Sequence, residues 1–244
     1  MIDIPIYKPE GRAKEYGDLA INIYTGCPHR CTYCYVPRIL RRDKETFHSN
    51  VEPRKDIVES VKRQLDRDQI TGKLIHLCFT CDPYPIGVDT TPTREIIKAI
   101  KDSGNHVQIL TKGGMSAERD FDLLDNGDWF GVTYTGCTDA YAYKVIAYEP
   151  NASPWRERLN SLVLAHKTGV NTWVSMEPAI NNYNCRVLIS EAGYIDLFRI
   201  GKLNYRTSGI NWGVLGRMYE HLCKIHNRNY VIKDDLRREM ERGA

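Results

Sequence analysis

The chain has 244 residues, of which 42% are hydrophobic and 27% charged, enough for a buried core with a solvated surface. Thirty-four basic residues against 31 acidic ones leave a formal charge of +3, which is too small to indicate nucleic-acid binding by itself. The chain has no long apolar run, no low-complexity tract and no linker, so we expect one cytoplasmic domain over residues 1–244 with no membrane segment.

Strand-like runs alternate with amphipathic helical segments along the chain. In chain order we expect strand Leu19–Tyr24, helix Pro53–Asp68, strand Lys73–Thr80, helix Pro92–Ser103, strand His106–Thr111 and helix Ser116–Leu124. The pattern continues with strand Trp129–Thr135, helix Pro154–Lys167, strand Asn171–Met176, helix Asn184–Ala192 and strand Ile195–Ile200. A further helix is expected at Asn211–His226, and the segment Asp234–Arg242 has balanced charge.

Six strand–helix units in about 180 residues predict an α/β fold with a parallel sheet and helices outside it. A complete eight-unit barrel needs about 250 residues, so a partial (β/α)6 barrel fits the chain better. We expect this core at residues 19–202, followed by a short helical C-terminal extension at 203–244. Active sites of such sheets lie at the carboxyl ends of the strands.

Three cysteines follow the first expected strand. Cys27, Cys31 and Cys34 are separated by four and three residues on a short loop, and three thiolates at this spacing can hold three corners of a cubane iron–sulfur cluster. A structural zinc site prefers short paired spacings and four ligands, so it would require His29 or a distant residue. A disulfide framework is disfavoured in a reducing compartment. The three thiols therefore predict a cluster with one iron open to a small molecule.

These residues resemble a known family. Cys27, Cys31 and Cys34, with Tyr33 before the last cysteine, resemble the signature of radical S-adenosylmethionine (SAM) enzymes, and the surrounding string is similar to the branch grouped with spore photoproduct lyase. Two further segments resemble that branch: Thr80–Tyr84 with Thr93-Arg94, and Leu110–Lys112. The resemblance covers roughly Leu19 to Gly201.

The resemblance implies a cofactor set and a reaction. It implies a [4Fe-4S] cluster held by the three cysteines, with SAM chelated to the open iron and cleaved reductively to a 5′-deoxyadenosyl radical that abstracts a substrate hydrogen. The cofactor carries this chemistry, so the protein positions and shields it. A strongly reducing electron donor such as flavodoxin or ferredoxin is also implied, and the enzyme would be of the lyase or transferase type.

The resemblance also implies site residues. Tyr33 would pack near the cluster and the adenine, and it could instead serve as an aromatic lid over the loop. Thr80, Cys81 and Asp82 occupy the segment expected to bind the SAM amino group, often through backbone carbonyls. Lys112 would bind the SAM carboxylate or remain a solvated lysine.

Four further polar residues stand at expected strand ends. Thr133, Thr135, Ser175 and Glu177 carry hydroxyl and carboxylate groups that suit the ribose hydroxyls. Glu177 could equally pair with a basic residue such as Lys202 at the neighbouring strand end.

Cys81 carries the one catalytic role that the resemblance suggests. The spore photoproduct lyase branch uses a cysteine in this neighbourhood as a hydrogen-atom donor, although that motif does not superpose cleanly on Thr80–Asp82. The other cysteines lack a second ligand triplet and are expected to be small buried hydrophobes.

The substrate is the least determined part of the function. Arg38, Arg41, Arg42 and Lys44 form a basic run that could meet phosphates, form a solvated helix face, or balance the cluster charge. A tyrosine-rich stretch (Tyr134, Tyr141, Tyr143 and Tyr148) could line a substrate mouth or bind a peptide. The substrate classes considered are therefore nucleic acid or nucleotide, peptide or protein, and small metabolite. The alternative function is an iron–sulfur electron-transfer protein without substrate chemistry, which the missing fourth ligand disfavours. The oligomeric state is left open.

Overall fold

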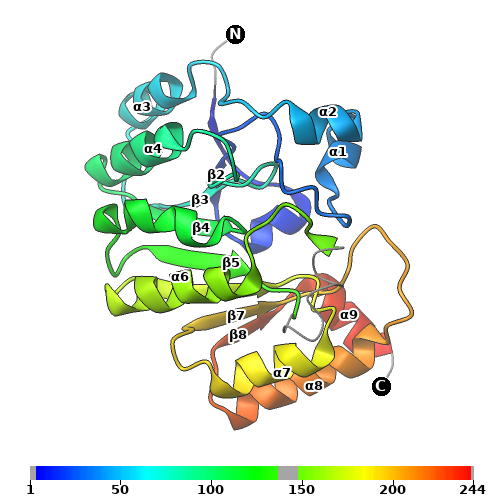
Figure 1. Ribbon diagram of the computed structural model, residues 1–244. Coiled ribbons are helices and arrows are strands. Elements are labelled where there is room, and N and C mark those ends of the chain that lie inside the picture. The colour runs from blue at the N-terminus through cyan, green and yellow to red at the C-terminus, as the bar shows by residue number, and fades with distance from the viewer. Residues whose placement is uncertain (1–3, 137–147, 243–244) are drawn as a thin grey trace.

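The fold is an open, curved sheet with helices packed along its outer side (Figure 1). The computed structural model describes residues 4–136 and 148–242, so Tyr141 and Tyr143 of the tyrosine-rich stretch lie outside the described residues. In the described ranges, no helix has the length and apolar character needed to cross a membrane.

Eight strands form one sheet in sequence order: β1 (Ile6–Tyr7), β2 (Leu19–Ile21), β3 (Leu74–Leu77), β4 (His106–Thr111), β5 (Trp129–Thr133), β6 (Asn171–Met176), β7 (Leu197–Ile200) and β8 (Tyr230–Ile232). β1 pairs antiparallel with β2, and every later pair is parallel. The sheet order places β1 and β8 at opposite edges, so the barrel is not closed. The predicted partial barrel is thereby confirmed.

Helices connect the consecutive strands from β2 to β8. They are α3 (Ile57–Arg67), α4 (Thr91–Asp102), η2 (Gly114–Leu123), α6 (Trp155–Lys167), α7 (Asn182–Glu191) and α8 (Trp212–Ile225), and a last helix, α9 (Asp234–Arg242), follows β8. Each buries one face, as in α4, where Ile96, Ile97 and Ile100 are fully covered. Gly104, at φ +71°, ends that helix before β4 begins.

The structure differs from the predicted elements in two ways. The segment expected as helix Ser116–Leu124 is the 3-10 helix η2, which packs tightly against α6: a Cβ at Gly114 would lie 3.2 Å from the Glu157 side chain of α6. Several very short elements are also present that the sequence did not predict, because two to six residues show no periodicity. These are β1, β8, the 3-10 helix η1 (Gly11–Glu15), α1 (Val36–Ile39) and α2 (Lys44–Ser49).

The inner side of the sheet carries an aromatic cluster. His76 of β3 stacks on Phe79 with ring centroids 4.2 Å apart, and Tyr16, which follows η1, lies 5.4 Å from His76 and 5.9 Å from Trp173 of β6. Burial lowers the pKa of His76 to about 4, so its ring is neutral at pH 7. These rings fill the barrel interior below the carboxyl ends of the strands, where the site lies.

Candidate active site

The cysteine loop leaves β2 and is held against α2. The Cys27 amide donates a hydrogen bond to the Phe47 carbonyl (3.2 Å), and a ring nitrogen of His48 lies 2.7 Å from the Cys27 carbonyl. Gly26 permits this close approach, because a Cβ there would lie 2.1 Å from the Phe47 oxygen. Helix α2 therefore fixes the start of the loop.

Cys27, Cys31 and Cys34 are free thiols that line one cavity of about 470 Å³ at the carboxyl ends of the strands. Burial raises the pKa of all three thiols, that of Cys31 to about 12. Three soft donors on one loop, with no histidine or carboxylate completing a tetrahedron in the described residues, suit an iron–sulfur cluster better than zinc. The donor set therefore fits the implied cluster.

Asp82 ties the loop after β3 to the end of β4. Its carboxylate accepts hydrogen bonds from the Thr111 hydroxyl (2.5 Å) and the Lys112 amide (2.8 Å), and its Oδ2 lies 3.4 Å from His29 Nδ1. Burial raises its pKa, but the charge and hydrogen bonds of its partners outweigh burial and lower it to about 2. The side chain expected at the SAM amino group is thus fully engaged by protein donors and positions the backbone around it.

Lys112 and Tyr33 meet above the cysteine loop. The Lys112 Nζ lies 5.9 Å from the centroid of the Tyr33 ring, and the Tyr33 hydroxyl donates to Glu149. Glu149 in turn pairs with Arg158 (Nη1 to Oε2, 2.7 Å). Burial lowers the pKa of Lys112, but nearby negative groups raise it by more than burial lowers it. The net pKa is therefore raised, and the lysine stays charged. The buried Glu149–Arg158 pair was not predicted from the sequence.

Glu177 lies at the opposite wall of the cavity. Its carboxylate accepts from the Tyr16 hydroxyl (2.8 Å) and the Asn204 amide (2.9 Å), and it lies 3.5 Å from Lys233 Nζ. Glu177 thus pairs with a basic residue, as one alternative predicted, but that residue is Lys233 and not Lys202, which pairs with Glu239 of α9. Sequence reasoning missed Lys233 because it follows β8, a strand too short to recognise.

The remaining predicted residues divide into two groups. Thr80, Thr133 and Ser175 line the cavity, and the buried Thr80 Oγ1 has no hydrogen-bond partner within the described part of the chain. Thr135 is not among the lining residues: its carbonyl accepts from the Ile180 and Asn181 amides (3.1 and 3.0 Å), which draws the chain away behind β6. Thr135 is therefore no longer a candidate for binding the ribose.

Cys81 also lines the cavity. Its sulfur accepts a hydrogen bond from the Tyr24 amide (3.4 Å), and Cys78, at φ +69°, lies beside it. Cys78 is buried, whereas Cys81 is partly exposed toward the cavity. Both residues line the cavity, and Cys81 is the more exposed of the two.

The cavity mouth carries a group that sequence reasoning did not bring together, although it named Arg38 as part of the basic run. Tyr35 stacks on Tyr205 with centroids 5.7 Å apart, and the guanidinium carbons of Arg12 and Arg38 lie 5.1 and 5.7 Å from the Tyr205 centroid. The four residues come from three distant segments, so local sequence gave no signal for them. We call them the mouth cluster.

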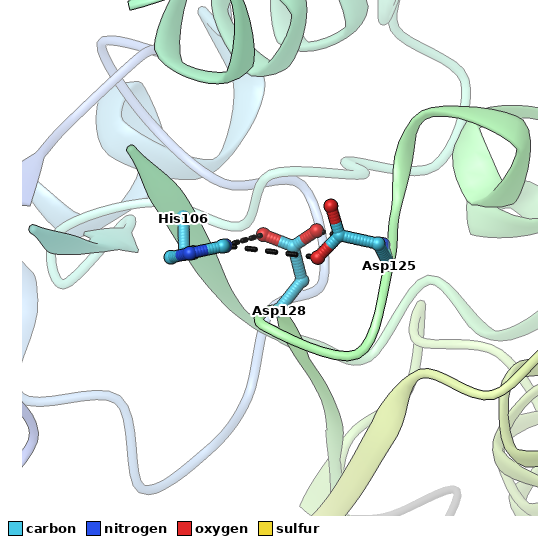
Figure 2. Close-up of side chains that lie close together, drawn as sticks. All are labelled: His106, Asp125 and Asp128. Carbon is cyan, nitrogen blue, oxygen red and sulfur yellow. Dashed lines mark hydrogen bonds and ion pairs between the residues drawn. The ribbon is translucent and has the colours of Figure 1, made fainter. Parts of the chain in front are cut away.

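A second group of polar side chains lies away from this site (Figure 2). His106 Nδ1 is 3.7 Å from both Asp125 Oδ1 and Asp128 Oδ1, near the amino ends of β4 and β5. Lys101 Nζ already binds both carboxylates at 2.7 and 2.6 Å. The ammonium supplies the positive charge that a metal would bring, so this group is a structural ion-pair network.

Comparison with known proteins places this geometry in a family. The family model of the radical SAM superfamily matches residues 21–182. The chain belongs to the radical SAM superfamily. Membership implies SAM and a [4Fe-4S] cluster as cofactors.

Solved structures of radical SAM enzymes share the fold. A variant of spore photoproduct lyase with dinucleoside spore photoproduct superposes with a TM-score of 0.67 at 14% identity, covering 92% of this chain and 78% of that one. SuiB of Streptococcus suis, solved bound to its precursor peptide SuiA, gives a TM-score of 0.62 at 12% identity over 87% of this chain and 48% of that one. SuiB is also solved bound to SAM. At these identities the likeness concerns the fold alone.

One curated relative matches in sequence. It is an uncharacterized protein, ORF301, of Acidianus two-tailed virus, 27% identical over 192 residues, which are 71% of this chain. The match spans 63% of the length of that relative.

Proposed function

We propose that this radical SAM protein is an enzyme that cleaves SAM reductively at a [4Fe-4S] cluster held by Cys27, Cys31 and Cys34. The observation that carries the proposal is the convergence on one cavity of three free thiols, the Lys112 ammonium and the Glu177 carboxylate. An electron-transfer protein needs a closed cluster and no such cavity. When bound, the cluster and SAM supply a 5′-deoxyadenosyl radical that abstracts a hydrogen atom from the substrate.

The residues of the chain supply binding and orientation. Lys112 offers a charged ammonium to the SAM carboxylate, and Asp82 holds the Lys112 backbone in place. Glu177, Ser175 and Thr133 offer acceptors and hydroxyls to the ribose, and Thr80 offers an unpaired hydroxyl. Tyr33 covers the loop while its hydroxyl is held by Glu149.

Cys81 is the candidate hydrogen-atom donor. Its thiol faces the cavity and is free of a disulfide. Donation of a hydrogen atom to a substrate carbon radical would form a C–H bond and leave a thiyl radical on Sγ. A Cys81→Ala variant should then still cleave SAM but yield side products, and clean turnover by that variant would argue against the role.

The substrate class that we propose is a nucleotide or nucleic acid. The mouth cluster combines two stacked tyrosine rings with two guanidinium groups, a combination suited to bases and phosphates. Spore photoproduct lyase, which shares the fold, is solved with a dinucleoside. Because SuiB is solved with a peptide, a peptide substrate is the alternative. A Tyr205→Ala variant should lose stimulation of SAM cleavage by oligonucleotides, whereas stimulation by peptides alone would favour the alternative.

The decisive experiment measures SAM cleavage. The cluster is reconstituted anaerobically, SAM and dithionite are added, and 5′-deoxyadenosine is quantified by chromatography. Cys34→Ala should abolish the product, whereas Cys223→Ala, a change at a buried cysteine of α8, should retain it. A bound cubane cluster whose electron paramagnetic resonance spectrum does not change when SAM is added would contradict the proposal.

A further inference from the structure

The short segment before α6 forms a second support for the cysteine loop, separate from α2. The Tyr148 carbonyl accepts a hydrogen bond from the Thr32 amide (2.8 Å), and the Asn151 amide donates to the His29 carbonyl (3.2 Å). The Asn151 side chain also donates to the Pro28 carbonyl (3.0 Å). Helix α2 contacts the start of the loop, whereas this segment contacts the stretch between the predicted cluster ligands.

The same segment is fixed to the barrel by buried groups. The Ser153 amide donates to the Lys112 carbonyl (3.0 Å) after the end of β4. Arg158 of α6 donates to the Ser153 carbonyl (2.8 Å) and to the Thr133 carbonyl at the end of β5 (3.1 Å). Its Nη1 also lies 2.7 Å from Oε2 of Glu149. One guanidinium group therefore joins the segment to both α6 and β5.

Glu149 connects this support to the aromatic side chain of the cysteine loop. Its carboxylate accepts a hydrogen bond from the hydroxyl of Tyr33, which lies between the second and third predicted cluster ligands in the chain. The side chains of Glu149 and Arg158 are 0% and 3% exposed, so both charges are shielded from water. Burial raises the pKa of Glu149, but the charges of Arg158 and Lys112 and the hydrogen bonds outweigh burial and lower it. The carboxylate is therefore ionised at pH 7, and its hydrogen bond to Tyr33 is charge-assisted.

A buried ion pair can have a structural role alone, but two features link this pair to the site. Its neighbours Tyr33 and Lys112 line the cavity. The charges also act on a predicted cluster ligand: burial raises the pKa of the Cys31 thiol, and among the nearby charges Lys112 lowers it and Glu149 raises it. Because nearby charge and solvent exposure set the reduction potential of an iron–sulfur cluster, these groups would act in the same way on a cluster held at Cys31.

We propose that the Glu149–Arg158 pair positions the cysteine loop through Tyr33, and that the Glu149 charge lowers the reduction potential of the cluster held there; this inference rests on the proposed function. Neither Glu149 nor Arg158 is among the described residues that line the cavity. Both are therefore positioning residues, which act through Tyr33 and Lys112 and not by contact with SAM or substrate. A reduced cluster carries one more negative charge than an oxidised one, so a nearby carboxylate disfavours reduction.

The first test follows the loop in the full-length, metal-free chain. Hydrogen exchange of residues 28–34 should be about tenfold faster in Glu149→Gln and in Tyr33→Phe than in wild type, because each change removes the charge-assisted bond between the segment and the loop. The control Glu220→Gln neutralises a carboxylate of α8 that pairs with Arg237 outside the cavity lining, and it should leave the loop unchanged. Exchange of the loop at the wild-type rate in Tyr33→Phe would overturn the positioning role.

The second test is a redox titration of the reconstituted cluster without SAM. Glu149→Gln should raise the midpoint potential by at least about 59 mV, a tenfold change in the one-electron equilibrium constant, whereas Glu220→Gln should leave it at the wild-type value. Tyr33→Phe keeps every charge and should shift the potential by less than half as much. A wild-type potential in Glu149→Gln, or an equal shift in Tyr33→Phe, would overturn the role of the Glu149 charge. Failure of the wild-type chain to hold a cubane cluster would contradict the proposed function, and hydrogen exchange would still decide the positioning role.

Discussion

At the scale of single residues, Lys233 illustrates how a buried charge is satisfied. Its side chain is 3% exposed, and its Nζ lies 3.5 Å from Glu177, 3.7 Å from Glu15 and 3.9 Å from the centroid of the Tyr16 ring. Two carboxylates and an aromatic face replace the water that the ammonium lost on folding. The lysine therefore holds the side of the cavity that carries Glu177.

We expect Lys233→Met to lower the free energy of unfolding by about 3 kcal/mol, because the change leaves both carboxylates without their cation. Lys202→Met removes a more exposed pair, with side chains 22% and 29% exposed, and should cost at most about 1 kcal/mol. Urea unfolding of the two variants measures the difference. Equal costs would show that the Lys233 network contributes no special stability.

Asp82 predicts a pH dependence of stability. Its pKa in the folded chain is about 2, below the ordinary value of 3.8, so its contribution is complete above about pH 4 and is lost as the pH falls toward 2. Wild type should therefore exceed Asp82→Asn in unfolding free energy by about 2 kcal/mol at pH 5. Urea unfolding of the metal-free proteins from pH 5 to pH 2 should show this difference in unfolding free energy decreasing. A difference that stays constant with pH would mean that the hydrogen-bond geometry of Asp82, and not its charge, stabilises the fold.

At the scale of elements, the contact between the cysteine loop and α2 depends on the absence of a side chain at Gly26. A Cβ there would meet the Phe47 carbonyl at 2.1 Å and the Asn50 carbonyl at 3.3 Å, and both are backbone atoms that cannot rotate away. The loop or the helix must then shift, and the cysteines shift with them.

We expect Gly26→Ala to lower the iron content after reconstitution several-fold, because a loop displaced by ångströms presents its thiols in the wrong geometry. The control is Gly209→Ala, where a Cβ would meet nothing within 4 Å. Iron and sulfide assays, with circular dichroism to verify the fold, measure the effect. Full cluster loading of Gly26→Ala would mean that the loop adapts without α2.

At the scale of the whole molecule, the open sheet is bridged by the N-terminal segment. Arg12 Nε pairs with Asp235 at 2.7 Å, the Asp234 amide donates to Glu15 (3.2 Å), and Arg199 donates to the Glu15 carbonyl. These contacts connect η1, which lies between β1 and β2 in the chain, to β7 and to the start of α9. They join the first strands of the open sheet to its last ones, which do not pair with each other.

We expect Asp235→Asn to loosen this bridge, because a buried carboxylate 5% exposed loses its charge-assisted bonds to Arg12 and Arg238. Hydrogen exchange of residues 10–16 should rise about tenfold, while exchange in β4 stays unchanged. The matched control Glu59→Gln, which removes an exposed pair with Lys62, should leave both regions unchanged. Unaltered exchange in Asp235→Asn would show that the Arg12–Asp235 pair does not hold η1.

The local sequence predicted the elements that have clear hydrophobic periodicity and the loop that carries Cys27, Cys31 and Cys34. Strands His106–Thr111 and Asn171–Met176 have the predicted bounds. Their residues follow from local patterns of burial and from the short-range spacing of cysteines, which need no knowledge of distant segments. The family and the partial barrel follow from the same local information.

Only the tertiary structure decided which distant side chains meet. The Glu177 partner is Lys233 rather than Lys202, Thr135 turns away from the cavity, and Tyr35 meets Tyr205 across the mouth. These arrangements involve segments far apart in the chain, and their positions depend on the register and curvature of the whole sheet. Periodicity records the face on which a residue lies, whereas pairing across the barrel depends on three-dimensional distances that no local pattern contains.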